Sequence, residues 1–121
     1  NLFPAALRLI DEIRPRAIMI ENVRGFLSAV FEDYRLGLKR QLSKMGYHTD
    51  WRLLNASDFG VPQLRPRVVI VALRKDMADA FDWPDVRPHN PPTVGETLRD
   101  LMAANGWHGT DRWVAGANDI A

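Results

Sequence analysis

At 121 residues, with 46% hydrophobic and 26% charged side chains, the chain has the size and composition of one small globular domain or a piece of a larger one. It has no cysteine, which excludes disulfides, thiolate metal sites and any reaction in which this chain itself supplies a thiolate. No apolar run reaches the roughly eighteen residues that a membrane span requires. With no cysteine, a cytoplasmic setting is the default expectation. The first residue is Asn and helical patterning starts at once, so we expect the natural N-terminus to lie upstream.

The net charge of +1 is unevenly distributed along the chain. The middle predicts a local positive patch, as a polyanion-binding surface requires, although an ordinary solvated face is the alternative. Its charged side chains are Arg52, Arg65, Arg67, Arg74 and Lys75 against Asp58 alone.

The first half of the chain predicts helix, strand and helix. Apolar residues at helical spacing predict an amphipathic helix over residues 2–13. The unbroken apolar run 17–20 is typical of a parallel strand that is buried on both faces. A second helix is predicted over residues 27–45, with Gly46 as its C-terminal stop.

The second half begins with two strands, at residues 48–54 and 68–73, separated by a loop. These strands are close enough in sequence to pair as an antiparallel β-hairpin at a sheet edge, and the whole pattern is that of an α/β fold. Beyond them, proline pairs mark an extended connector. Thr93 with Glu96 three residues later then predicts a helix that opens with a capping box.

Glu21 follows the first apolar strand directly and is followed by Asn22. In open α/β sheets ligands bind at the carboxyl ends of the strands, so the Glu21 carboxyl is a candidate binding group. Asn22 can fix the turn by hydrogen bonding to backbone groups. The alternative is that Glu21 caps a neighbouring helix or faces solvent.

The second candidate segment is Gln63-Leu64-Arg65-Pro66-Arg67, which leads into the last apolar strand. Arg65 and Arg67 are two residues apart, so both guanidinium groups point to one face if the strand begins at this segment. A guanidinium is always charged and presents several donors in a fixed fork. The alternative is a solvated edge strand in which Pro66 blocks unwanted pairing.

Together, Glu21-Asn22-Val23 and the Gln-x-Arg-x-Arg segment resemble the paired motifs of the cytosine-5 DNA methyltransferases, over about residues 1–101. The resemblance implies part of a Rossmann-like, S-adenosylmethionine-dependent methyltransferase fold with duplex DNA as partner. Such an enzyme adds a cysteine thiolate to C6 of a flipped-out cytosine and methylates C5. It leaves open whether the parent belongs to a restriction–modification system.

The resemblance also implies a role for each motif residue. A protonated Glu21 would donate to cytosine N3 and accept from the N4 amino group, which selects cytosine and activates the ring. That role calls for burial, so that the carboxyl can hold a proton. Arg67 would contact O2 of the base, and Arg65 would brace the site or the backbone. Asn22 and Gln63 would support them, with Gln63 filling the gap in the duplex or holding its loop.

Several family parts are not in this sequence. The Pro-Cys nucleophile motif is expected upstream, and no Gly-x-Gly turn follows a strand, so the S-adenosylmethionine site is expected to lie largely outside the chain. We interpret residues 1–75 as the later part of the catalytic domain, and 76–121 as a connector and the truncated start of the target-recognition region. Alone, the chain is expected to be inactive and to self-associate through an exposed sheet edge. The alternatives are a transfer RNA cytosine-5 methyltransferase and a catalytically dead nucleic-acid-binding module.

Overall fold

The computed structural model describes residues 2–86 and 90–108. The chain forms two compact units, one from residues 1–54 and 66–84, the other from residues 55–65 and those from 85 onward. Within the described residues, no helix is both long enough and apolar enough to cross a membrane.

The first unit contains two helices, α1 (Phe3–Ile13) and α2 (Glu32–Lys44). The predicted first helix is confirmed, but the predicted second helix is too long at its start. Its first residues instead form two short 3₁₀ turns, separated at Ser28 by an extended backbone conformation. The Arg35 guanidinium donates to the carbonyl oxygens of Phe26 and Ser28, so these groups have a partner outside a regular helix.

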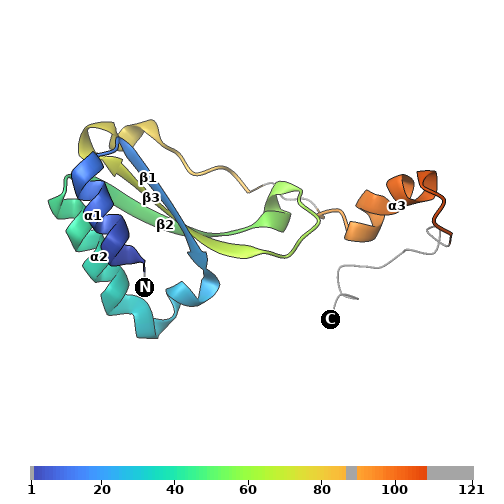
Figure 1. The fold of residues 1–121 in the computed structure, drawn as a ribbon, viewed down its shortest axis with the longest axis horizontal. Helices are drawn as coiled ribbons and strands as arrows, with labels where there is room; N and C mark the ends of the chain where they lie inside the picture. Colours follow the sequence, from blue (N-terminus) through green and yellow to red (C-terminus); the bar gives the residue numbers. More distant parts are fainter. Residues whose placement is uncertain (1, 87–89, 109–121) are drawn as a thin grey trace. The chain divides into compact units, whose positions relative to one another are not determined.

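Three strands form one sheet in the order β1-β3-β2, as Figure 1 shows. They are β1 (Ala17–Val23), β2 (Tyr47–Asn55) and β3 (Pro66–Arg74). The predicted hairpin is confirmed, because β2 lies at an edge and is hydrogen-bonded to β3.

The prediction of a parallel first strand buried on both faces is wrong. Strand β1 runs antiparallel to β3, and its residues alternate between exposed and half-buried. The physical reason is that the helices of this unit cover one face of the sheet, and antiparallel strands tolerate a face that is open to water.

The hydrophobic core lies between the two helices and one face of the sheet (Figure 1). Alternate residues of β3 point into it, as the period of two requires. Tyr47 fixes the edge strand to the same core, since its hydroxyl donates to the Pro15 carbonyl oxygen at 2.7 Å. The fully buried side chains include Leu38, Leu42, Tyr47, Val68, Ile70 and Ala72.

The second unit contains the loop 55–65 and helix α3 (Val94–Ala104). The predicted capping box is confirmed: the Glu96 backbone N–H donates to the Thr93 hydroxyl at 3.1 Å, and the Thr93 backbone N–H donates to the Glu96 carboxylate at 2.7 Å. The bond from the Thr93 backbone N–H, and after it the Thr93 side chain, lower the pKa of the Glu96 carboxyl below its ordinary value.

Thr93→Ala is expected to weaken the first turn of α3 by about 1 kcal/mol, because an N-cap acceptor is lost. In the unchanged protein, the folded pKa of Glu96 lies below its unfolded value. The contribution of the Glu96 carboxylate to the box is therefore fully present at neutral pH, and it is lost as the pH falls through that lowered folded pKa. Backbone chemical shifts of residues 94–104, followed by NMR during acid titration, measure both effects.

The matched control for this change is Thr97→Ala. Thr97 lies inside α3, and its hydroxyl donates to the Thr93 carbonyl oxygen without capping the helix. Equal shift changes in both variants would contradict a specific role for the box.

Candidate active site at the end of strand β1

The central feature of the site is an ion pair between Glu21 on β1 and Arg67 on β3, formed by Oε1 and Nε. Arg67 lies directly opposite Val23, and Glu21 lies opposite Val69. Glu21 and Arg67 are thus diagonal neighbours across the two strands, on the sheet face away from the helices. The antiparallel register brings Glu21 of the first motif to Arg67, the last residue of the second.

The Glu21 side chain is more exposed than its predicted role requires. Its exposed fraction is 55%, against 27% for Arg67, so the burial expected of Glu21 is not found in the described part of the chain. The reason is its position: β1 is an edge strand, and Glu21 points to the face that α1 and α2 leave uncovered.

Asn22 lies next to Glu21, and its side-chain oxygen accepts a hydrogen bond from the Val23 N–H at 2.8 Å. This is the local backbone contact predicted for it. Glu21 and Asn22 also line an open hollow of about 410 Å³ at the end of β1. The other lining residues are Leu2, Phe3, Ala6 and Ile20.

Gln63 and Arg65 belong to the second unit, in the loop before β3. The strand begins at Pro66, so the condition on which Arg65 and Arg67 would share a strand face, a strand that already includes Arg65, is not met. The backbone N–H of Arg65 donates to the Asn55 side-chain oxygen at 2.8 Å, and the Ala56 N–H donates to the Arg65 carbonyl oxygen. Asn55 therefore closes this loop, a role that sequence reasoning missed although an Asn at a strand end is a familiar turn signal.

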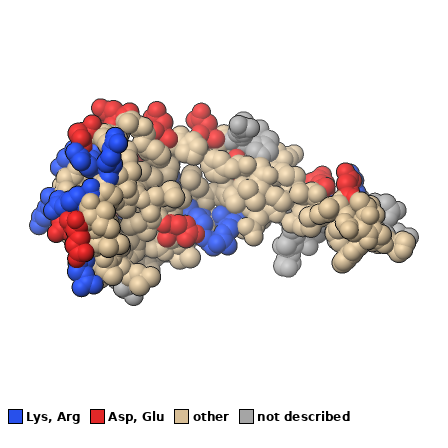
Figure 2. Space-filling model, turned by 45° about the horizontal axis from the view of Figure 1, so that its top comes forward, with Lys and Arg blue, Asp and Glu red and all other residues tan. Residues whose placement is uncertain are grey.

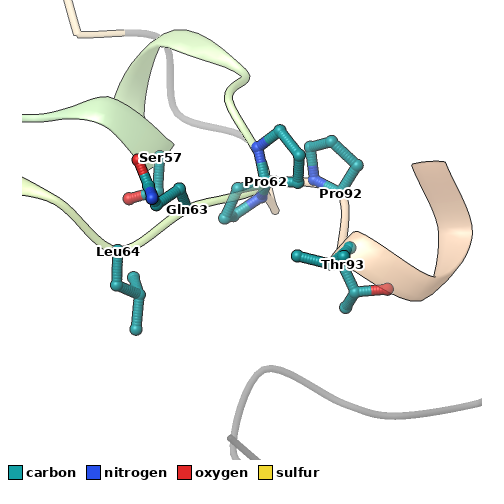
Figure 3. A pocket seen from close by; sticks show the side chains of 8 residues that line it. Ser57, Pro62, Gln63, Leu64, Pro92 and Thr93 are labelled. Carbon is teal, nitrogen blue, oxygen red and sulfur yellow. The ribbon is translucent and has the colours of Figure 1, made fainter. Parts of the chain in front are cut away.

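The same loop shares a small pocket with the start of α3 within the second unit. The pocket has a volume of about 40 Å³, and Gln63 and Leu64 line it together with Pro92 and Thr93. In Figure 3, Pro62 of the loop lies beside Pro92.

The predicted positive patch is partly neutralised in the structure. Arg67 pairs with Glu21, and Arg74 forms two hydrogen bonds, at 3.0 and 3.1 Å, to the carboxylate of Asp76. Figure 2 likewise shows acidic and basic side chains interspersed on the visible face of the molecule. An ordinary solvated face therefore describes much of this charge.

The described residues do not form a nucleotide-type cradle after β1. Gly25 is the glycine nearest the end of that strand, and a Cβ added there would meet nothing within 4 Å. Its backbone also has no positive φ, so neither a tight turn nor a close approach requires a glycine. The turn after β1 therefore does not fit the close approach that a nucleotide-type cofactor such as S-adenosylmethionine makes to a glycine turn.

Comparison with known proteins identifies the family of this chain. The family model for C-5 cytosine-specific DNA methylases matches residues 1–121. The chain belongs to this family. The resemblance inferred from the two motifs is thereby confirmed.

Two curated relatives match the whole chain. The type II methyltransferase M.NaeI of Lentzea aerocolonigenes is 55% identical over 121 residues, and M.NgoMIV of Neisseria gonorrhoeae is 50% identical. The chain spans only 29% and 39% of the lengths of these relatives.

Solved structures agree with the fold. A prophage-encoded E. coli protein classed as a DNA modification methyltransferase matches 76% of this chain and 27% of its own, with a TM-score of 0.61 and 27% identity. A mutant of Spodoptera frugiperda DNMT2 matches 77% of this chain and 29% of its own, with a TM-score of 0.57 and 26% identity. The α/β architecture is thus part of the Rossmann-like methyltransferase fold.

Because the Glu21–Arg67 ion pair is exposed to water, we expect it to contribute little to the free energy of unfolding. In a double-mutant cycle of Glu21→Gln and Arg67→Gln, we expect a coupling free energy of unfolding below about 1 kcal/mol, as for other water-exposed pairs. Urea unfolding of the four proteins measures it. A coupling of several kcal/mol would instead make the pair a structural element.

Proposed function

We propose that this chain is the base-recognition part of a DNA (cytosine-5-)-methyltransferase and that Glu21 and Arg67 bind the target cytosine. The observation that carries the proposal is their pairing on adjacent strands, at the end of β1. A carboxyl and a guanidinium side by side present the two kinds of group that the pyrimidine edge of cytosine requires. N3 and O2 are acceptors, while the N4 amino group is a donor.

The chemistry follows from that edge. A protonated Glu21 donates to N3 through one oxygen and accepts from N4 through the other, whereas thymine presents a donor and an acceptor at the same positions. Arg67 donates to O2. A proton held at N3 withdraws electrons from C6, the ring atom that the nucleophile attacks. The family's nucleophilic thiolate is not in this chain, and S-adenosylmethionine supplies the methyl group when bound elsewhere in the parent.

In the free protein the Arg67 guanidinium is paired with the Glu21 carboxylate. An arriving cytosine must therefore separate the two charges before Glu21 can meet N3 and Arg67 can meet O2. When the base enters, the Glu21–Arg67 ion pair is thus replaced by one contact of each side chain with the cytosine.

The remaining residues support this pair. Arg65 braces the site or contacts the DNA backbone, and Gln63 holds its loop or fills the gap that the flipped base leaves. Asn22 fixes the end of β1. Residues 1–75 then form the later part of the catalytic domain, and residues 76–121 form the connector and the start of the target-recognition region; of these, 87–89 and 109–121 lie outside the described residues.

The full-length protein that carries this chain is the material for the test. Labelled methyl transfer from S-adenosylmethionine is measured with duplex DNA and with transfer RNA, and the product is digested to locate the methyl group. Label at C5 of cytosine in duplex DNA supports the proposal. Label in transfer RNA alone would assign the enzyme to that substrate, and DNA binding with no transfer would indicate a catalytically dead module.

The relatives' names favour a type II methyltransferase of a bacterial restriction–modification system. Methylation of duplex DNA in a bacterium places such an enzyme in the cytoplasm. The digestion pattern of genomic DNA from a host that expresses the full-length protein tests the type II assignment.

The isolated 121-residue chain should self-associate. Strand β1 is at a sheet edge, and its Met19 and Val23 side chains are 77% and 58% exposed. Sedimentation analysis should show a mass above that of the monomer, and Met19→Lys should shift the distribution toward monomer. A monomer at all concentrations would contradict this expectation.

A further inference from the structure

The sheet face that the helices leave open is partly covered by the chain that follows β3. This covering segment comprises a 3₁₀ turn (Lys75–Ala80) and the extended residues 81–84. Lys75 donates its backbone N–H to the Gly46 carbonyl oxygen at 3.0 Å, which starts the return of the chain over the sheet. The yellow segment beside β2 and β3 in Figure 1 shows the return.

Trp83 is held near the end of the covering segment by two side chains of β2. Its indole N–H donates to the Asp50 carboxylate at 2.9 Å. The Arg52 guanidinium lies over the indole ring, 5.4 Å from its centroid, which is a cation–π contact. Asp50 and Arg52 are two residues apart on one strand, so they point to the same face.

A second ring completes the anchor. Phe81 meets Trp83 edge to face, with centroids 5.2 Å apart and an interplanar angle of 77°. Both rings border a cavity of about 120 Å³ on the open face of the sheet. The other lining residues are His48, Asp50, Val71, Leu73 and Ala78.

The place of Trp83 in the chain gives this anchor its significance. Pro84, which follows it, restricts the Trp83 backbone to extended conformations. Pro84 is also the last residue of the first unit, and the second unit resumes at Asp85. The Trp83 clasp, made by Asp50, Arg52 and Phe81, therefore fixes the point at which the chain leaves the first unit.

We propose that the Trp83 clasp is a positioning device for target recognition: it anchors the connector through which the sheet carries the target-recognition region. This inference rests on the proposed function, because only a DNA methyltransferase has a target sequence to discriminate. Trp83, Asp50 and Arg52 act through the connector and touch no reacting atom. Loosening the clasp should impair the choice of DNA sequence while leaving the chemical step intact.

The test uses the full-length protein with Asp50→Ala and Trp83→Ala. Mutations that do not touch the ligand usually change the coupling between two sites only modestly. The discrimination between the cognate duplex and single-base-pair variants should therefore fall by a factor on the order of 10. The KM for cognate duplex should rise in step, and kcat should stay within about two-fold, because no transition-state contact is removed. Asp50→Asn keeps an acceptor for the indole N–H and should restore discrimination.

The matched control is Trp51→Phe. Trp51 lies on the same strand, and Lys39 stacks over its ring at 5.3 Å, but Trp51 packs against the hydrophobic core. That variant should change stability without changing discrimination. If Asp50→Ala and Trp51→Phe alter discrimination equally, or if Asp50→Ala only lowers the melting temperature, the clasp is merely structural and the inference fails.

Hydrogen exchange gives a readout that does not depend on activity. Asp50→Ala should speed amide exchange in residues 81–86 while leaving α3 unchanged, and unaltered exchange there would overturn the anchor. Absence of any methyl transfer to DNA by the unchanged protein overturns the proposed function, and with it the role in discrimination. The exchange experiment still decides whether the clasp anchors the connector.

Discussion

Glu21→Gln in the full-length protein should lower kcat by a factor on the order of 10² to 10⁴, the usual contribution of a positioned general acid. A glutamine amide can still donate to N3 and accept from N4, so the pattern that selects cytosine is kept. It cannot transfer a proton to N3, so the activation of C6 is lost. The variant thus separates recognition from activation.

Single-turnover methyl transfer at saturating duplex measures this loss, and equilibrium binding of the same duplex should change little. The control is Glu12→Gln, the same substitution on the exposed face of α1, which should leave kcat unchanged. Near-normal turnover by Glu21→Gln would remove Glu21 from the reaction and with it the central assignment.

Arg67→Ala should weaken capture of the target cytosine by about 1–3 kcal/mol, the range for a specific base contact. Binding is compared between a cognate duplex and one with an abasic site at the target position, where O2 is missing. The loss should be confined to the duplex that contains the base. Arg67→Ala should leave the protein folded, because the ion pair is expected to contribute little to the free energy of unfolding.

Arg40→Ala is the matched control, because Arg40 is an exposed arginine on α2 and away from the site. It should affect both duplexes equally or not at all. If Arg67→Ala weakens every duplex alike and reduces the salt dependence by about one phosphate contact, Arg67 contacts the backbone and not the base.

The sequence predicted most of the local structure because the signals are local. Thr93 and Glu96 predict the N-terminal cap of α3, and the helical spacing of apolar residues in the segment 2–13 predicts α1. The predicted start of α2 is too early because the Phe26 and Ser28 carbonyl oxygens accept from the Arg35 guanidinium, several residues further along the chain, and the backbone bond from Phe31 to Ser28 closes only a 3₁₀ turn. Apolar spacing cannot reveal such a competitor.

The direction and the burial of β1 differ from the prediction for another reason. An unbroken apolar run is compatible with a doubly buried parallel strand and with an antiparallel one, and only the pairing partner decides between them. Residues 17–23 pair with 67–73, far along the chain, so nothing local records that register.

The sequence by itself determined the family, since Glu21-Asn22-Val23 and the Gln-x-Arg-x-Arg segment identify it by residue type and order. It also excluded a thiolate nucleophile from this chain, because the chain contains no cysteine. Only the tertiary structure decided that Glu21 meets Arg67, that Arg65 lies before the strand, and that Trp83 is clasped by Asp50 and Arg52. These contacts depend on strand register and on how the chain returns over the sheet, which are properties of distant segments brought together by folding.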